Sequence, residues 1–112
     1  MTQSQRFLFA PFLPITDLGG GVRRQIMGYN NNIMMVKVEF SKDAIGTLHH
    51  HSHSQSTYVV SGIFEVTIGT ETRILKPGDG FLAPPEIEHG VVCIEEGVLL
   101  DAFSPVREDF LK

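Results

Sequence analysis

Cysteine is almost missing from this chain, and so are long apolar runs and clusters of positive charge. The single thiol, Cys93, excludes an intramolecular disulfide and is typical of a reducing compartment, so we expect a cytoplasmic protein. No apolar stretch approaches the roughly 20 residues that a membrane span needs. The formal net charge is −4, and lysine and arginine form no run. We therefore expect neither nucleic acid nor a membrane as a partner.

The segment Phe7–Leu13 is strongly apolar. It resembles the core of a secretion signal, but it is short, contains Pro11 and is followed by no convincing small-residue cleavage site. We predict instead that residues 1–19 form an N-terminal arm. Its apolar side chains would pack on the rest of the domain or on a second copy of the chain.

Short strand-like runs fill the rest of the sequence. With 112 residues, 42% of them hydrophobic, the chain suffices for one domain with one core, which we place at residues 20–112. Glycine, proline, asparagine and aspartate separate runs of β-branched and aromatic residues. Only residues 106–111 hint at a helix. Many short strands in one small domain predict an all-β sandwich or barrel. The predicted strands are 23–29, 33–40, 47–51, 57–60, 63–68, 73–75, 81–83, 90–94 and 98–103.

Alternation is clearest in the second of these strands. Four apolar side chains share one face there and are predicted to point into the core: Met34, Val36, Val38 and Phe40.

Four of the five histidines lie within five residues, at positions 49, 50, 51 and 53. Side chains of a strand alternate between its faces, so His49 and His51 point the same way and could grip one metal ion with nitrogens about 2 Å from it. His50 points the other way. Pairing His51 with His53 instead would put Thr57, a poor metal ligand, at the fourth residue after the pair. We therefore prefer His49 and His51, and assign His53 to the rim of the site as a substrate contact.

The spacing that follows resembles the first motif of the cupin family. That motif is His-x-His, then three or four residues, Glu, six residues and Gly. Here it is matched by His49, His51 and Gly62, with Gln55 in place of the glutamate. The leading glycine of the motif is out of register, because Gly46 lies only three residues before His49.

The second cupin motif is matched by Gly78, Pro84 and His89. Glu86 stands where glycine is usual, and Cys93 where asparagine is usual. The resemblance implies a double-stranded β-helix, or jelly-roll, barrel with one divalent metal ion. The ligands that it implies are His49, His51, Gln55 and His89.

Gln55 puts a neutral amide where the family usually has a carboxylate. Three imidazoles and an amide leave the +2 charge of an ion uncompensated, so it would attract carboxylate or alkoxide oxygens. This favours polarising an anionic small molecule over oxygen chemistry. The donor set suits Zn, Ni, Mn, Co or Fe(II) and does not choose among them.

Asp101 interrupts the apolar strand 98–103 and shares its face with Leu99 and Phe103. A carboxylate inside an apolar strand is costly unless it is paired or functional. If this face lines the interior, Asp101 could act as a general acid or base. If it faces solvent, Asp101 is an ordinary surface residue, and the pattern leaves both alternatives open.

Three stretches resemble a narrower group, the small cupins of the pectin degradation protein KdgF type. They are residues 21–29, 58–62 and, most specifically, 101–111. The resemblance implies an enzyme that opens 4,5-unsaturated uronate monosaccharides, from pectin or alginate, to linear keto sugars. It also implies that Asp101 is the catalytic acid or base and that Phe103 and Arg107 line the site.

The substrate so implied is a small anionic sugar, which the metal and a cation such as Arg107 would anchor. Arg23 and Arg24 are adjacent in a strand, so at most one of them faces the cavity. We assign Arg23 as the candidate substrate contact, although an exposed structural role fits either arginine equally well.

Two other functions stay open. The chain could be a non-enzymatic, metal-dependent sugar-binding module, or another cupin enzyme such as a dioxygenase or a dimethylsulfoniopropionate lyase. We expect a homodimer in every case, because small cupins often pair and the segment 7–13 is more apolar than a free terminus should be.

Overall fold

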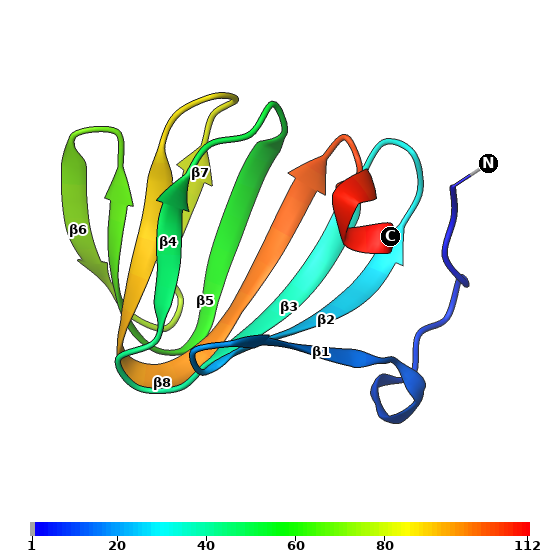
Figure 1. Ribbon diagram of the computed structural model, residues 1–112, viewed down its shortest axis with the longest axis horizontal. Coiled ribbons are helices and arrows are strands. Elements are labelled where there is room, and N and C mark those ends of the chain that lie inside the picture. Colours follow the sequence, from blue (N-terminus) through cyan, green and yellow to red (C-terminus); the bar gives the residue numbers. More distant parts are fainter. Residues whose placement is uncertain (1) are drawn as a thin grey trace.

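The computed structural model describes residues 2–112, which form antiparallel β-structure with two short 3-10 helices (Figure 1). No helix in these residues is long and apolar enough to cross a membrane. The strands are β1 (Ile15–Gly19), β2 (Val22–Tyr29), β3 (Met34–Phe40), β4 (Ile45–His49), β5 (Ser54–Ile68), β6 (Glu71–Leu75), β7 (Gly80–Ala83) and β8 (His89–Ser104). The 3-10 helices are η1 (Ala10–Phe12) and η2 (Glu108–Leu111).

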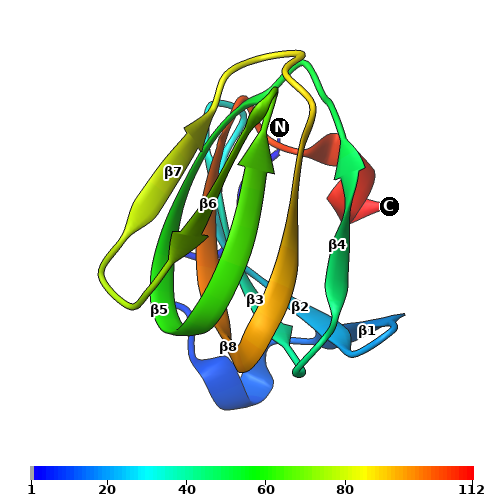
Figure 2. The ribbon, with the colours of Figure 1, turned by 90° about the vertical axis from the view of Figure 1, so that its left-hand side faces the viewer.

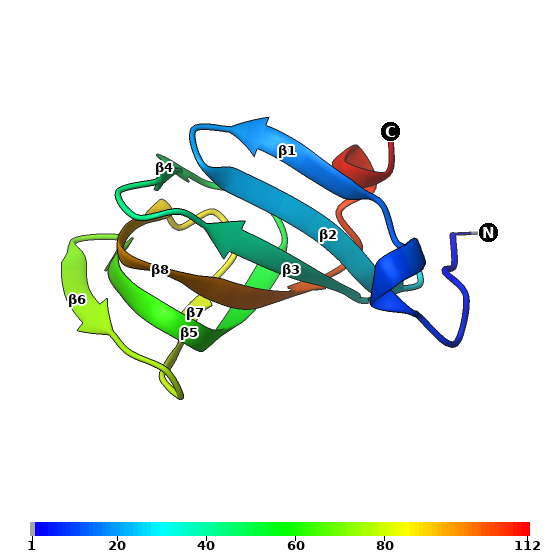
Figure 3. The ribbon, with the colours of Figure 1, turned by 90° about the horizontal axis from the view of Figure 1, so that it is seen from below.

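The strands form two layers that share their two longest members, β5 and β8. The C-terminal half of β8 pairs with β3, and its N-terminal half pairs with β4. Likewise, the first half of β5 pairs with β7 and the second half with β6. One layer is therefore β1-β2-β3-β8-β5-β7 and the other β4-β8-β5-β6. Figure 3 shows β1, β2, β3, β8 and β5 side by side, and Figure 2 shows β4 and β7 on opposite sides of the molecule.

Two glycines allow β5 and β8 to bend together from one layer into the other. Gly62 has φ +83°, and a Cβ added there would lie 2.6 Å from the carbonyl oxygen of Glu96. A Cβ on Gly97 would overlap the carbonyl oxygen of Ser61. The pairing register of β5 with β8 shifts at this place, as expected for a bulge that bends a strand.

The core fills the space between the layers. The predicted inward face of residues 33–40 is confirmed, because Met34, Val36, Val38 and Phe40 are all buried. Phe40 meets Phe64 of the other layer edge to face, with ring centroids 5.3 Å apart. The all-β jelly-roll architecture is therefore the one that the sequence predicts.

Several predicted boundaries differ from the structure. The runs 57–60 and 63–68 are one bent strand, β5, and the runs 90–94 and 98–103 are likewise parts of β8. The predicted strand 47–51 starts and ends two residues earlier, so His51 lies in the loop after β4. The suggested helix at 106–111 is the shorter η2.

The first 19 residues are only in part a separate arm. Residues 15–19 form β1, which pairs with β2, so the sheet begins five residues before the boundary predicted at residue 20. The preceding stretch is tied to β2 by Gln25, whose side-chain amide donates to the carbonyl oxygens of Ala10 and Leu13 at 3.0 and 3.2 Å. Its aromatic rings stay exposed, to 80% at Phe7 and 85% at Phe12.

Candidate metal centre

Three histidines converge between the layers. His49 ends β4 and pairs in register with His89, which begins β8, while His51 lies in the loop that leads to β5. Their ligand nitrogens all lie within 4.8 Å of one another, so the three side chains could hold one metal ion. His50 points away, with its Nδ1 3.6 Å from an exposed Glu86 carboxylate.

Backbone carbonyls fix the tautomer of each converging imidazole. The Nδ1 atoms of His49, His51 and His89 lie 2.7, 2.9 and 2.9 Å from the carbonyl oxygens of residues 47, 53 and 87. A carbonyl oxygen only accepts, so Nδ1 must carry the hydrogen. In the neutral ring Nε2 then presents a lone pair, and this is the arrangement that metal-binding histidines commonly have. Burial lowers the pKa of His89, which favours the neutral form.

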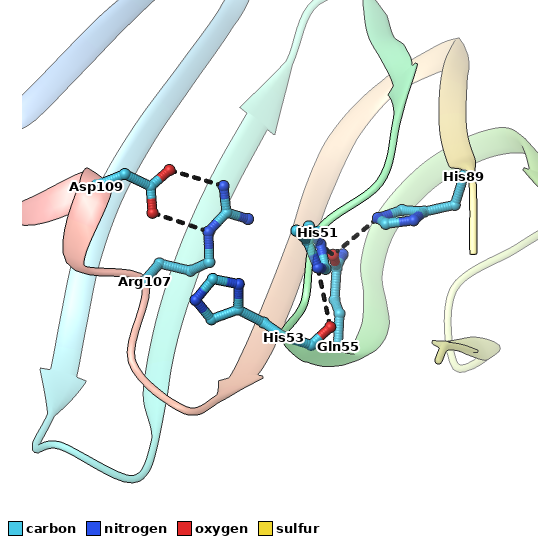
Figure 4. Close-up of polar contacts among 6 residues, drawn as sticks. All are labelled: His51, His53, Gln55, His89, Arg107 and Asp109. Carbon is cyan, nitrogen blue, oxygen red and sulfur yellow. Dashed lines mark hydrogen bonds and ion pairs between the residues drawn. The ribbon is translucent and has the colours of Figure 1, made fainter. Parts of the chain in front are cut away.

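Gln55 is held with its oxygen toward the histidines. Its amide nitrogen donates to Thr57 Oγ1 at 3.0 Å and, more weakly, to Asp101 Oδ1 at 3.4 Å. Its Oε1 lies 3.0 Å from His51 Nε2 and 3.1 Å from His89 Nε2 (Figure 4). Three lone-pair acceptors therefore face one point, which is favourable only when a cation lies there. The residues present fit a divalent ion with an N₃O donor set.

Asp101 faces the interior, beside this cluster. Its Oδ1 accepts a hydrogen bond from Thr57 Oγ1 at 2.7 Å, and Leu99 and Phe103 on the same face of β8 are buried. Burial raises the pKa of Asp101 to about 6, and the hydrogen bonds from Thr57 and Gln55 oppose that rise. Of the two alternatives that the alternation leaves open, the structure has the interior one.

Phe103 contacts both the histidine cluster and the guanidinium of Arg107. Its ring centroid lies 5.8 Å from that of His51, and the guanidinium carbon of Arg107 lies 5.1 Å from the Phe103 ring. Arg107 Nε and Nη2 donate to the two carboxylate oxygens of Asp109 at 3.1 and 2.9 Å. Figure 4 shows His53 between this ion pair and His51.

His53 is not part of the three-histidine cluster. Its ring is 5.5 Å from that of His51, and its Nδ1 is buried without a hydrogen-bond partner in the described residues. Burial, followed by the nearby charge of Arg107, lowers the pKa of His53. His53 therefore lies beside the cluster, and its role as a substrate contact at the rim stays a prediction.

Arg23 is the one predicted site residue that the structure does not bring to the site. Its guanidinium pairs with Glu39 at 2.7 Å on the outer face of the sheet. Arg24 points inward instead, 4.0 Å from the centre of the Phe110 ring. Sequence reasoning also missed Thr57, although it lies two residues after Gln55 and therefore on the same face of β5.

Several known proteins are similar to this chain in sequence and in fold. Residues 36–103 match the family model of the cupin domain. The pectin degradation protein KdgF of Dickeya dadantii (strain 3937) is 49% identical over 109 residues, which cover 96% of this chain and 99% of that protein. A crystal structure of an RmlC-like cupin from Shewanella frigidimarina superposes with a TM-score of 0.95 at 47% identity, covering 98% of this chain and 99% of the other.

A KdgF structure from Halomonas sp. is also similar, with a TM-score of 0.90 and 38% identity over 96% of this chain and 99% of that one. These relatives match the described fold along nearly its whole length, and the family match covers the stretch from β3 to β8 that carries the converging histidines. The chain therefore belongs to the cupin family and, within it, to the group of KdgF-like cupins.

Proposed function

We propose that this protein opens 4,5-unsaturated uronate monosaccharides to linear keto sugars. The observation that carries the proposal is the Asp101 carboxylate, which lies inside the barrel and contacts the same Gln55 amide that faces the three histidines. The name of the Dickeya dadantii relative, a pectin degradation protein, supports a sugar acid of this origin.

Four side chains would hold the metal ion: His49, His51, Gln55 and His89. A divalent ion with these neutral ligands would supply Lewis-acid polarisation of a bound oxygen. The Asp101–Thr57–Gln55 hydrogen bonds keep the amide oxygen of Gln55 directed at the histidines. Thr57 is thus a positioning residue for the fourth ligand.

Asp101 would move the proton that the reaction requires. When the ring of an unsaturated uronate opens, the anomeric hydroxyl loses its proton and the ring C–O bond breaks. These two changes leave an enolate, which becomes a ketone when its carbon gains a proton. A carboxylate inside the barrel with a pKa of about 6 can accept the first proton and return one to carbon.

Arg107 would bind an anionic oxygen of the sugar. Asp109 occupies Nε and Nη2 of its guanidinium, which leaves Nη1 for a ligand. Phe103 contacts both this arginine and the ring of His51, and so links the two polar parts of the site.

Turnover of the unsaturated monosaccharide from pectin, followed by the loss of its ultraviolet absorbance, tests the proposal. We expect Asp101→Asn to retain the metal, because the amide oxygen still accepts from Thr57, and to lower the rate by about 10²–10⁴-fold. Glu65→Gln, which removes an exposed carboxylate from β5, is the matched control and should leave the rate unchanged.

Two results would contradict the proposal. One is wild-type turnover by a metal-loaded Asp101→Asn variant, which would leave Asp101 without a catalytic role. The other is the absence of turnover by metal-loaded wild-type protein that still binds the sugar, which would favour a non-enzymatic binding module.

A further inference from the structure

Arg24 on β2 is an inward-facing charge beside the candidate site that the proposed reaction does not use. It pairs in register with Val38, whose side chain is buried, so it projects from the inner face of its strand. Its guanidinium carbon lies 4.0 Å from the centroid of the Phe110 ring, and Arg107 contacts the same ring at 4.2 Å. The two arginines therefore share one aromatic support, although they lie far apart in the sequence.

The two arginines differ in how their charges are compensated. Arg107 forms a two-point ion pair with Asp109, whereas Arg24 forms no ion pair in residues 2–112. The Nε of Arg24 is buried and donates to no acceptor in these residues. Because this Nε is covered, an acceptor from outside the chain would reach the guanidinium through its Nη groups, which form no hydrogen bond in these residues.

The charges around this arginine favour an anion. Two guanidiniums face one carboxylate, that of Asp109, which leaves one positive charge without a partner. A carboxylate is a suitable occupant, because the planar fork of arginine matches its two oxygens.

We propose that Arg24 binds the carboxylate of the sugar substrate, together with Arg107, and makes the site specific for uronates over neutral sugars. The inference rests on the proposed function for the identity of the ligand. It places the acid group of the sugar near Phe110 and its hydroxyl oxygens near the three histidines. Arg24 rather than Arg23 is then the substrate contact on β2.

Binding of saturated galacturonate, which lacks the reactive double bond, tests this assignment without turnover. We would titrate metal-loaded protein with galacturonate and with neutral galactose, and follow amide chemical shifts. Arg24→Gln should weaken galacturonate binding by roughly 10–100-fold, which is what a hydrogen-bonded charge contributes, and leave galactose binding unchanged. Arg24→Lys should recover part of the affinity, because it keeps the charge but not the fork.

Arg23→Gln is the matched control, since it removes the adjacent but outward-facing guanidinium, and it should bind galacturonate like wild type. Unfolding temperatures would establish that every variant is folded. If Arg24→Gln binds galacturonate like wild type, or loses both sugars equally, the assignment is overturned. It is also overturned if wild type does not prefer galacturonate to galactose.

The outcome is independent of the reaction. If Arg24→Gln loses galacturonate selectively while wild type fails to open the unsaturated sugar, the carboxylate site stands and the proposed activity fails. If turnover is found and Arg24→Gln keeps its uronate preference, the activity stands and Arg24 has only a packing role against Phe110.

Discussion

His50 and His51 are neighbours in the sequence with opposite surroundings. The side chain of His50 is 64% exposed beside Glu86, whereas His51 lies in the cluster with a fixed tautomer. His50 is therefore a control for His51, because it has the same side chain but does not face the candidate metal centre.

We expect one equivalent of divalent metal per chain in the wild type and none after His49→Ala and His51→Ala are combined. Two of four ligands are then missing, and the remaining donors cannot complete a site. Elemental analysis after dialysis measures this, and His50→Ala is the control that should keep its metal. Stoichiometric metal in the double variant would refute the ligand assignment.

Asp101 gives the metal-free protein a distinct pH dependence. Its pKa in the folded protein is about 6, above the roughly 3.9 of an unfolded aspartate, so the folded state binds more protons between these values. The free energy of unfolding should therefore fall as the pH rises from 4 to above 6. In Asp101→Asn this loss of stability is absent, so the unfolding free energies of the two proteins should diverge by roughly 2–3 kcal/mol over that range.

Denaturant unfolding at pH 4, 5, 6 and 7 in the presence of a chelator measures the divergence. The two proteins differ only at residue 101, so the pH dependence of their difference reports on the Asp101 carboxyl group. A difference in unfolding free energy that stays constant with pH would mean that the carboxyl group ionises normally in the fold.

The sequence predicts most of this site but not all of it. Motif spacing identifies His49, His51, Gln55 and His89, whereas the alternation argument for His49 and His51 does not hold, because β4 ends at His49 and His51 lies in the loop. Alternation within β2 allows two phases, and the one that turns Arg24 inward follows from the register with β3, where Arg24 lies opposite the buried Val38. Hydrogen bonds such as that from Thr57 to Asp101 likewise depend on pairing between β5 and β8.

At the scale of elements, the bend shared by β5 and β8 explains why two predicted turns are absent. Ser61-Gly62 and the segment 95–97 carry turn residues, and both were predicted to separate strands. A glycine with positive φ serves a turn and a bulge equally well. A bulge differs from a turn here only through the continuous pairing from Ser54↔Ser104 to Ile68↔His89, and this pairing is not local in sequence.

Gly62→Ala should lower the free energy of unfolding by at least about 3 kcal/mol, because a strained φ and a clash with the Glu96 carbonyl add together. Gly78→Ala is a control for the strain alone. It has φ +94° but no atom within 4 Å of an added Cβ, and should cost about 1–2 kcal/mol. Chemical denaturation measures both, and equal losses would show that the bend has room for a side chain.

At the scale of the whole molecule, the aromatic side chains before β1 remain uncovered. Phe7, Phe9 and Phe12 are exposed to 80%, 64% and 85%, although hydrogen bonds to β2 hold the backbone that carries them. So much apolar surface on one segment is typical of an interaction site.

We therefore expect a homodimer at micromolar concentration that uses these rings. Replacing Phe7, Phe9 and Phe12 together by serine should shift the molar mass in light scattering from twice the chain mass toward 12.4 kDa. Replacing the exposed Ile74 on β6 by serine is the control, since it removes a similar side chain elsewhere. A monomeric wild type would contradict the expectation.

Sharing β5 and β8 between the layers also determines how the molecule can unfold and fold. Neither layer can melt while the other keeps its pairing, so thermal unfolding should be one cooperative transition. During synthesis, β5 emerges before β8, and the edge of β5 that pairs with β8 stays open until residues 89–104 have left the ribosome. Closure of the barrel therefore waits until β8 has been synthesised, and its non-local pairing predicts slow folding for a domain of this size.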